Sequence, residues 1–287
     1  MRIEDIEGHG RDPAVIDGNC RDLRRLGLDW DEGYGVGGPH EPYRQSGRSA
    51  LYRASLDRLL EQKLVYPCIC SRRDVQRMGA APHAGDFHPY DGRCRGRFRS
   101  YDEARRVLEG SGRLPAWRFR VPAGEIVFLD RLCGEQRVNL AETYGDFPIA
   151  RHPDGIGYQL AVVADDIDMA VTQIVRGGDL LACTPWQILL WKALAPERPL
   201  PEYCHLPVVV DSDGKRLAKR TGGLTLDALF SAGVRPERIL GLLAYWGGWA
   251  EFGEELSVDA ILPRFRLDTL SDRRPTLDEK ALKFLLP

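Results

Sequence analysis

Helical and strand patterns alternate along this chain, and the alternation limits the folds that it can adopt. Residues 13–26 and 49–64 carry apolar side chains at helical spacing. Strand character appears at residues 66–70, 117–121, 126–129 and 170–175. This order is typical of α/β proteins with a largely parallel sheet. Because the chain has 287 residues, 43% of them hydrophobic, it can bury a substantial core.

Turn and capping residues add detail to this pattern. Ser100 and Glu103 match a capping box, which predicts a short helix that ends near Leu108. Residues 147–151 and 156–163 flank a His-Pro-Asp-Gly turn, and we expect them to form a β-hairpin.

The second half of the chain favours helices. Asp179 follows two glycines and is predicted to cap a helix. Near the C-terminus, Gly233 is expected to end one helix and Pro236 to begin the next, which the glycine pair at 247–248 would end.

Composition excludes several classes of protein. Basic and acidic residues number 40 and 42, so an RNA partner must be met by a local patch of charge. No apolar run approaches the length of a membrane span, and the N-terminus lacks the apolar core of a signal peptide. Seven cysteines without an export signal favour free thiols and metal ligands over disulfides. We therefore expect a cytoplasmic protein without membrane contact, and nothing requires more than a monomer.

A glycine-rich segment at residues 33–38 satisfies the dinucleotide-binding fingerprint, but its surroundings do not. It follows an acidic loop and runs into Pro39, with no strand before it and no helix after it. We predict a plain loop there. The sequence also has no Walker A phosphate loop and no serine in a nucleophile elbow.

Three cysteines are spaced as metal ligands. Cys68 and Cys70 lie at the end of a predicted strand, and Cys94 follows a loop that contains His88 and Tyr90. Three thiolates and one further donor would close a tetrahedral site, which suits structural zinc best. Generic ligand chemistry favours His88 as the fourth donor. The alternative is that the cysteines pack as small apolar residues.

Two basic stretches are candidates for phosphate binding. In extended backbone, one face would carry Arg93, Arg95, Arg97 and Arg99. That face would contact RNA phosphates, or it is a solvated charged edge. Residues 211–220 form a basic, glycine-containing loop after the strand-like residues 206–210. Such a loop suits the triphosphate of a nucleotide, although solvated surface charge would produce the same pattern.

Several segments resemble the glutamyl-queuosine tRNA(Asp) synthetases, short relatives of the glutamyl-tRNA synthetases. They are Arg2-Ile-Glu-Asp5, Tyr43-Arg-Gln-Ser46, Tyr158-Gln-Leu-Ala-Val-Val-Ala-Asp-Asp166, Val175-Arg-Gly-Gly-Asp179, Thr184-Pro-Trp-Gln187 and Arg216-Leu-Ala-Lys-Arg220. The last of them resembles the KMSKS loop of the family. The resemblance extends over nearly the whole chain.

The resemblance implies a class I synthetase α/β fold with a Rossmann-like parallel sheet. The catalytic domain would comprise residues 1–65 and 146–210. A zinc-binding acceptor-end subdomain would be inserted at residues 66–145. Residues 211–287 would contain the KMSKS-type loop and a helical segment that contacts the tRNA stem.

The resemblance also implies roles for individual residues. Glu4 would accept the α-ammonium group of L-glutamate, Arg176 would hold its side-chain carboxylate through a bidentate fork, and Tyr158 would line the same pocket. Lys219 would be catalytic, steadying the phosphates of ATP, which is bound with Mg²⁺. The ATP-binding loop would consist of Arg216, Leu217, Ala218, Lys219 and Arg220.

The chain departs from the family pattern in the loop, where Arg216 and Ala218 stand at positions often held by Lys and Ser. For the metal, the family spacing Cys-x-Cys followed by Tyr-x-x-x-Cys implies that the structural Zn²⁺ is held by Cys68, Cys70, Tyr90 and Cys94. The resemblance thus favours Tyr90 over His88 as the fourth ligand.

One expected signature is missing. Family members open with a strand, a loop and a helix that bears the HIGH motif, and none of the six histidines here lies in that context. We expect that the gene model is shortened and that the true start of the protein lies upstream of Met1. A sheet without that strand would have an unpaired edge, so the chain as written is expected to be inactive and marginally stable.

Three functions follow from these features. In the first, ATP and L-glutamate form glutamyl-adenylate, and the glutamyl group is then esterified onto queuosine in tRNA(Asp). The second is a truncated ordinary glutamyl-tRNA synthetase that charges the terminal adenosine. The third is a non-catalytic tRNA-binding relative. The compact segment at residues 90–94 and the Thr-Pro-x-Gln segment favour the first.

Overall fold

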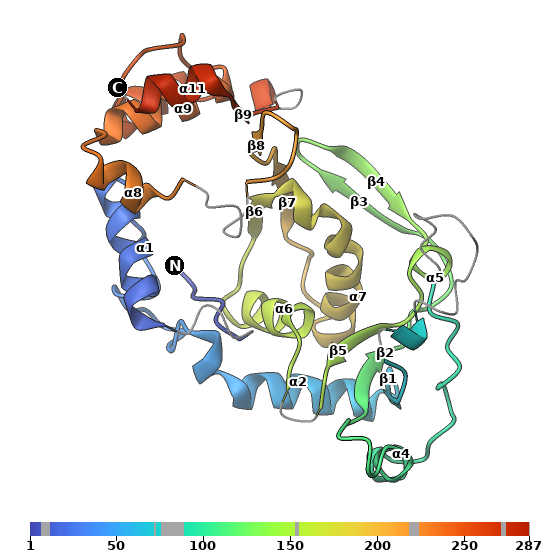
Figure 1. Cartoon of the computed structure of the whole chain (residues 1–287). Coiled ribbons are helices and arrows are strands. Elements are labelled where there is room, and N and C mark those ends of the chain that lie inside the picture. The colour runs from blue at the N-terminus through green and yellow to red at the C-terminus, as the bar shows by residue number, and fades with distance from the viewer. Residues whose placement is uncertain are drawn as a thin grey trace.

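The computed structural model describes residues 1–6, 12–71, 73–75, 89–152, 155–217, 224–270 and 274–286. The principal hydrophobic core involves two sheets and three helices: α2 (Ser49–Glu61), α6 (Tyr158–Asp168) and α7 (Thr184–Leu194). Figure 1 shows α8, α9 and α11 on one side of the molecule, with α4 and β1 on the opposite side. Among the described residues, no helix combines the length and the apolar character needed to cross a bilayer.

The strands of the core form two short sheets. The antiparallel sheet has the order β1-β2-β5, with bounds Val65–Cys68, Ala116–Phe119 and Phe147–Ala150. The other sheet has the order β4-β3-β7-β6, with bounds Gly134–Val138, Ile126–Asp130, Glu202–Leu206 and Gln173–Gly177. β7 pairs in parallel with β3 and β6, whereas β3 and β4 are antiparallel. The predicted largely parallel sheet is therefore confirmed only in part: the sheets are mixed, because tight connections such as that between β3 and β4 force antiparallel pairing.

Residues 158–168 form helix α6 and not the second arm of a hairpin. Ala150 and Ile156 make an isolated antiparallel bridge on either side of the predicted turn, whose residues 153–154 lie outside the described part of the chain, and Gly157 is the N-cap of the helix. Every residue from 160 to 166 is buried, because α6 packs against both α2 and α7. A helix that is buried all round has no polar stripe, and its sequence therefore resembles a buried strand.

The C-terminal predictions are confirmed. Helix α8 (Leu226–Ser231) ends before Gly233, and α9 (Pro236–Gly247) is closed by Gly248 in the left-handed conformation at φ 78°. These helices share a second hydrophobic core with α11 (Glu279–Leu285). Helix α1 (Pro13–Arg25) contacts α8 although the two are far apart in sequence (Figure 1).

The shorter elements confirm one predicted cap and correct another. Helix α4 (Tyr101–Val107) is capped by Ser100, whose hydroxyl accepts the backbone N–H of Glu103 at 3.2 Å. Asp179 caps no helix, because it lies inside the 3₁₀-helix Gly178–Cys183. The other elements are η1 (Gln45–Gly47), α5 (Leu140–Thr143), β8 (Val210–Asp211), α10 (Val258–Ile261), η4 (Leu262–Arg264), η5 (Asp268–Leu270) and β9 (Thr276–Leu277).

The alternating arginines do not share one extended face. Residues 93–97 form consecutive turns, which glycines with positive φ bend away from an extended path. Arg93 pairs with Asp91 at 3.0 Å, whereas Arg95 pairs with the buried Asp146. The predicted single face is therefore wrong, although all four arginines are exposed.

The N-terminal residues run beside a loop, where Ile3 makes a parallel bridge with Arg44. The glycine-rich segment at residues 33–38 is a loop, as predicted, and it packs against Met1. A Cβ on Gly33 would lie 2.1 Å from the carbonyl oxygen of Met1, and its φ of 127° suits glycine. Glycine is thus required there for close packing and not for binding a dinucleotide.

Candidate active site and metal centre

Arg176 lies on β6 and is held from two sides. Its Nε donates a hydrogen bond to Nε2 of His205 at 3.0 Å, and its Nη2 donates one to Oγ1 of Thr184 at 2.8 Å. His205 belongs to the adjacent strand β7 and Thr184 begins α7, so three elements orient one guanidinium. In the described part of the chain β6 pairs with β7 alone and forms the edge of its sheet.

His205 is in turn held by Asp130. Its Nδ1 lies 2.6 Å from Oδ2 of Asp130, and neither side chain has any exposed surface. Burial disfavours the charged form of Asp130 and by itself raises its pKa. Hydrogen bonds from the backbone of Cys133 and from His205 outweigh this effect and lower the pKa overall. Burial and the charge of Arg176 lower the pKa of His205 against the opposing effect of Asp130. The pair is therefore a carboxylate and a neutral imidazole that donates from Nδ1.

Glu4 lies close to a second partly buried arginine, Arg2. Nη2 of Arg2 donates to Oε1 of Glu4 at 2.9 Å, while Nη1 donates to Oδ1 of Asp166 at 2.6 Å. Burial by itself lowers the pKa of Arg2, but the carboxylates of Asp166 and Glu4 raise it by more, so Arg2 stays cationic. The side chain of Glu4 is 39% exposed, compared with 8% for Asp166. Glu4 is therefore anchored on one side and accessible to a cationic group on the other.

Tyr158 stands at the first turn of α6, within electrostatic reach of both other predicted glutamate ligands. Burial, together with the charge of Glu4, raises the pKa of Tyr158 to about 12, and the charge of Arg176 opposes this increase. The charges of Glu4, in the N-terminal segment, and of Arg176, on β6, thus both act on Tyr158.

The predicted nucleotide loop begins with a tight turn. The strand-like segment expected at residues 206–210 is not one strand: β7 ends at Leu206, residues 207–209 have no regular structure, and β8 begins at Val210. The backbone N–H of Lys215 then donates to Oδ1 of Asp211 at 2.8 Å, and Gly214 has a φ of 74°. Arg216 then makes an isolated antiparallel bridge with Val210, so the turn brings it back beside β8.

Arg216 provides the contact between this loop and the site. Its guanidinium forms an ion pair with Asp179, three residues after Arg176. The backbone N–H of Leu217 donates to the carbonyl of Val209 at 3.1 Å, so the described end of the loop lies beside the incoming chain. The other predicted loop residues lie outside the described part: Ala218, Lys219 and Arg220.

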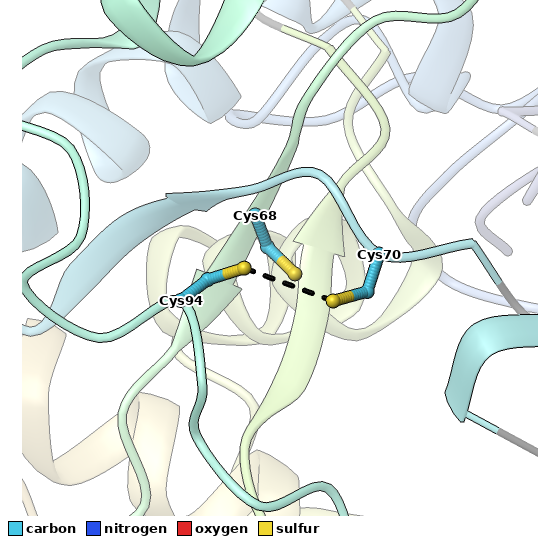
Figure 2. A group of neighbouring side chains, drawn as sticks. All are labelled: Cys68, Cys70 and Cys94. Carbon is cyan, nitrogen blue, oxygen red and sulfur yellow. Dashed lines mark hydrogen bonds between the residues drawn. The ribbon is translucent and has the colours of Figure 1, made fainter. Parts of the chain in front are cut away.

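The three cysteines predicted to bind metal converge. Figure 2 shows the sulfur atoms of Cys68, Cys70 and Cys94 turned toward one another, and all lie within 4.8 Å. The sulfurs of Cys70 and Cys94 are 3.7 Å apart. Two thiolates bound to one tetrahedral zinc at about 2.3 Å would be separated by about 3.8 Å. The spacing of the thiols therefore fits zinc.

Tyr90 points its hydroxyl at the same group. Its Oη lies 3.3 Å from the sulfur of Cys68 and 3.8 Å from that of Cys70. An oxygen ligand at about 2.1 Å would lie about 3.6 Å from a sulfur ligand of the same zinc. Burial raises the pKa of Tyr90, and it raises that of Cys70 to about 12, so a bound cation would be needed to ionise them. His88 lies outside the described residues.

Residues that support these sites were missing from the sequence predictions. Asp130 and His205 each lie near the end of an apolar strand, and that isolated polar position was the available signal. Asp146 is fully buried beneath the cysteine region, where it accepts hydrogen bonds from the hydroxyl of Tyr66 and the guanidinium of Arg95. Its partners lie 80 and 51 residues away, so no local motif identifies it.

Comparison with known proteins identifies the class. Residues 1–284 match the family model described as tRNA synthetases class I (E and Q), catalytic domain. The chain therefore belongs to this family of aminoacyl-tRNA ligases. It is 46% identical over 269 residues to the Glutamyl-Q tRNA(Asp) synthetase of Symbiobacterium thermophilum. The aligned residues cover 93% of this chain and 81% of that relative. The protein of the same name from Nitratidesulfovibrio vulgaris is 45% identical over 249 residues, covering 86% of this chain and 75% of that relative.

Solved structures show the same fold. A crystal structure of a glutamate tRNA ligase from Elizabethkingia meningosepticum in complex with its amino acid superposes with a TM-score of 0.78 at 26% identity. The superposition covers 99% of this chain and 61% of that one, so the chain spans about three-fifths of the ligase.

Proposed function

We propose that this protein activates L-glutamate with ATP and transfers the glutamyl group to queuosine in tRNA(Asp). The observation that carries the proposal is the guanidinium of Arg176, which is oriented by His205 and Thr184 and whose charge acts on Tyr158, as does the charge of Glu4. This set of charges complements an amino acid with a second carboxylate. The two relatives at 46% and 45% identity, which bear the name Glutamyl-Q tRNA(Asp) synthetase, support the choice of acceptor.

In this proposal each end of glutamate has its own partner. Arg176 binds the side-chain carboxylate through two parallel N–H donors, which a lysine could not provide. Glu4 accepts the α-ammonium group, and Tyr158 closes the pocket between them. The α-carboxylate is then left to react.

The reaction has two steps. An oxygen of the α-carboxylate attacks the α-phosphorus of ATP, supplied with Mg²⁺, and pyrophosphate leaves. A hydroxyl group of queuosine then attacks the carbonyl carbon of the adenylate, and AMP leaves. Lys219 would steady the phosphates during the first step, within the loop formed by Arg216, Leu217, Ala218, Lys219 and Arg220.

Zinc would have a structural role. Cys68, Cys70, Cys94 and Tyr90 would hold the ion and thereby fix a region with few apolar residues, and a structural zinc site contributes on the order of 10 kcal/mol to folding. We retain the division into a catalytic domain at residues 1–65 and 146–210, an insertion at 66–145 and a stem-contact segment at 211–287. Because each site is built from one chain, we propose that the protein acts as a monomer.

The decisive experiment measures transfer of labelled glutamate to tRNA(Asp) with and without queuosine, and to tRNA(Glu). We expect labelling of tRNA(Asp) only when queuosine is present. Labelling of unmodified tRNA(Glu) alone would instead identify an ordinary glutamyl-tRNA synthetase. If glutamate binds but neither tRNA is labelled, the non-catalytic function is favoured. Glutamate-dependent ATP–pyrophosphate exchange isolates the first step, and robust exchange would contradict the expectation of inactivity drawn from the missing HIGH motif.

A further inference from the structure

We propose that Asp130 and His205 are positioning residues for Arg176 and thereby set the affinity for glutamate. The proposal rests on the proposed function in one respect, because it takes Arg176 as the group that binds the side-chain carboxylate. The side chains of Asp130 and His205 have no exposed surface. They therefore cannot touch a ligand, and His205 acts through the two side chains that it contacts on the side of the site, Arg176 and Thr184.

The three residues form a chain of hydrogen bonds across neighbouring strands. Asp130 ends β3, which pairs with β7 at Tyr203. His205 lies two residues further along β7, and its Cα partner on β6 is Arg176. The order β3-β7-β6 thus places a carboxylate, an imidazole and a guanidinium on successive strands.

Asp130 fixes which nitrogen of His205 carries the proton. Its Oδ1 already accepts the backbone N–H groups of Leu132 and Cys133 at 3.0 and 2.9 Å, so the carboxylate cannot easily turn. Its Oδ2 faces Nδ1 of His205, which must donate. The neutral ring then has an unprotonated Nε2, which accepts from Nε of Arg176. A proton on Nε2 would instead point at Oγ1 of Thr184, which lies 3.2 Å away, and Nε–H of Arg176 would lose its acceptor.

This arrangement selects the face that Arg176 presents to a ligand. A guanidinium has five N–H groups. His205 takes the one on Nε, and Thr184 takes one on Nη2. The rest lie on Nη1 and Nη2, where they form the fork that matches a carboxylate. Because the side chain is already ordered, less rotamer freedom is lost when glutamate binds.

Two substitutions of His205 distinguish a role in positioning Arg176 from a role in stabilising the fold. His205→Asn keeps an amide that reaches Asp130 but provides no acceptor at the place of Nε2. His205→Gln provides an amide oxygen near the place of Nε2 but loses the link to Asp130. We expect the dissociation constant for glutamate, measured by calorimetric titration of the full chain, to rise about 10- to 100-fold in His205→Asn and about 3-fold or less in His205→Gln. The dissociation constant for ATP should change by less than about 2-fold in both.

Equal weakening of glutamate binding in the two variants would refute positioning through Nε2, as would a parallel loss of ATP binding. A second measurement needs no variant. In ¹⁵N-labelled wild-type protein without glutamate, we expect Nε2 of His205 to have the chemical shift of an unprotonated nitrogen and Nε–H of Arg176 to exchange slowly with solvent. The opposite tautomer or fast exchange would overturn the proposal. If wild type shows the expected spectrum but does not bind glutamate, the proposed function fails while the hydrogen-bonded chain stands.

Discussion

At the residue scale, the recognition chemistry depends on one guanidinium. Replacing Arg176 with lysine keeps the charge but removes both the contact with His205 and the planar fork. We expect Arg176→Lys to weaken glutamate binding at least about 10-fold, measured by titration calorimetry, with ATP binding unchanged. Arg131→Lys is the matched control, because Arg131 is exposed and forms only a surface ion pair with Glu202. Wild-type affinity in Arg176→Lys would show that the fork does not hold the carboxylate.

The buried histidine gives the fold a defined response to acid. Burial lowers the pKa of His205, so the unfolded state binds more protons than the folded state between that pKa and about 6.5. The free energy of unfolding must therefore fall as the pH falls through this window. His205→Gln lacks this titrating group. As the pH falls, the free energy of unfolding of wild type minus that of the variant should therefore decrease, by at most about 1.4 kcal/mol per pH unit.

Urea unfolding of both proteins at about pH 7.5 and pH 5.5 measures this difference. The window lies above the range in which ordinary carboxyl groups titrate, so their contribution largely cancels between the two proteins. A difference that stays constant, or that grows on acidification, would show that the folded state does not hold His205 neutral.

The predictability of individual residues depended on whether a local motif contains them. The spacing of Cys68, Cys70 and Cys94 is local, and the three sulfurs converge as expected. Asp130 and His205 are 75 residues apart and meet only because their strands pair, and neither stands in a motif. The supporting residues of a site are thus harder to predict than the residues that would touch its ligand.

At the element scale, the segment from β1 to α4 depends on its metal ligands. Among its described residues, the small buried cluster contains Tyr66, Cys68, Tyr90 and Cys94. We expect one zinc ion per chain by elemental analysis, and we expect a chelator to lower the melting temperature. Cys70→Ser should lose the ion, whereas Cys183→Ser, outside the cluster, should retain it.

Tyr90→Phe decides which residue is the fourth ligand. It removes one oxygen and preserves the ring, over which Arg118 stacks at 4.0 Å. If Tyr90 binds zinc, we expect the zinc affinity of Tyr90→Phe to fall about 10-fold or more, in a competition assay with a chromogenic chelator. Unchanged affinity in Tyr90→Phe together with loss in His88→Ala would assign the ligand to the histidine.

Elements were predicted well where their ends carry a chemical signal. Ser100 and Pro236 mark helix starts that the structure confirms. Helix α6 was mistaken for a strand because it packs on several sides, so burial and not secondary structure determined its apolar pattern. The direction of strand pairing was predicted only in part, because it depends on how the connections cross and not on strand composition.

At the scale of the whole molecule, charge is balanced overall but uneven locally. The net charge of −2 provides no general attraction for RNA. Two adjoining hollows beside α4 are nevertheless lined by exposed arginines, namely Arg93, Arg97, Arg105, Arg106 and Arg113. We call this the α4 arginine surface. Although the predicted extended face is wrong, part of that basic segment lies on this surface.

Binding of tRNA(Asp) should depend on the α4 arginine surface through phosphate contacts. If Arg97 and Arg106 each neutralise one phosphate, the double variant Arg97→Ala with Arg106→Ala should lower the slope of log affinity against log salt by about 2. Fluorescence anisotropy at several salt concentrations measures this slope. Arg58→Ala with Arg137→Ala is the matched control, because it removes two exposed charges from α2 and β4, outside both hollows. Equal slopes in the two double variants would mean that the α4 arginine surface is only solvated charge, and the tRNA would then have to be held elsewhere on the molecule.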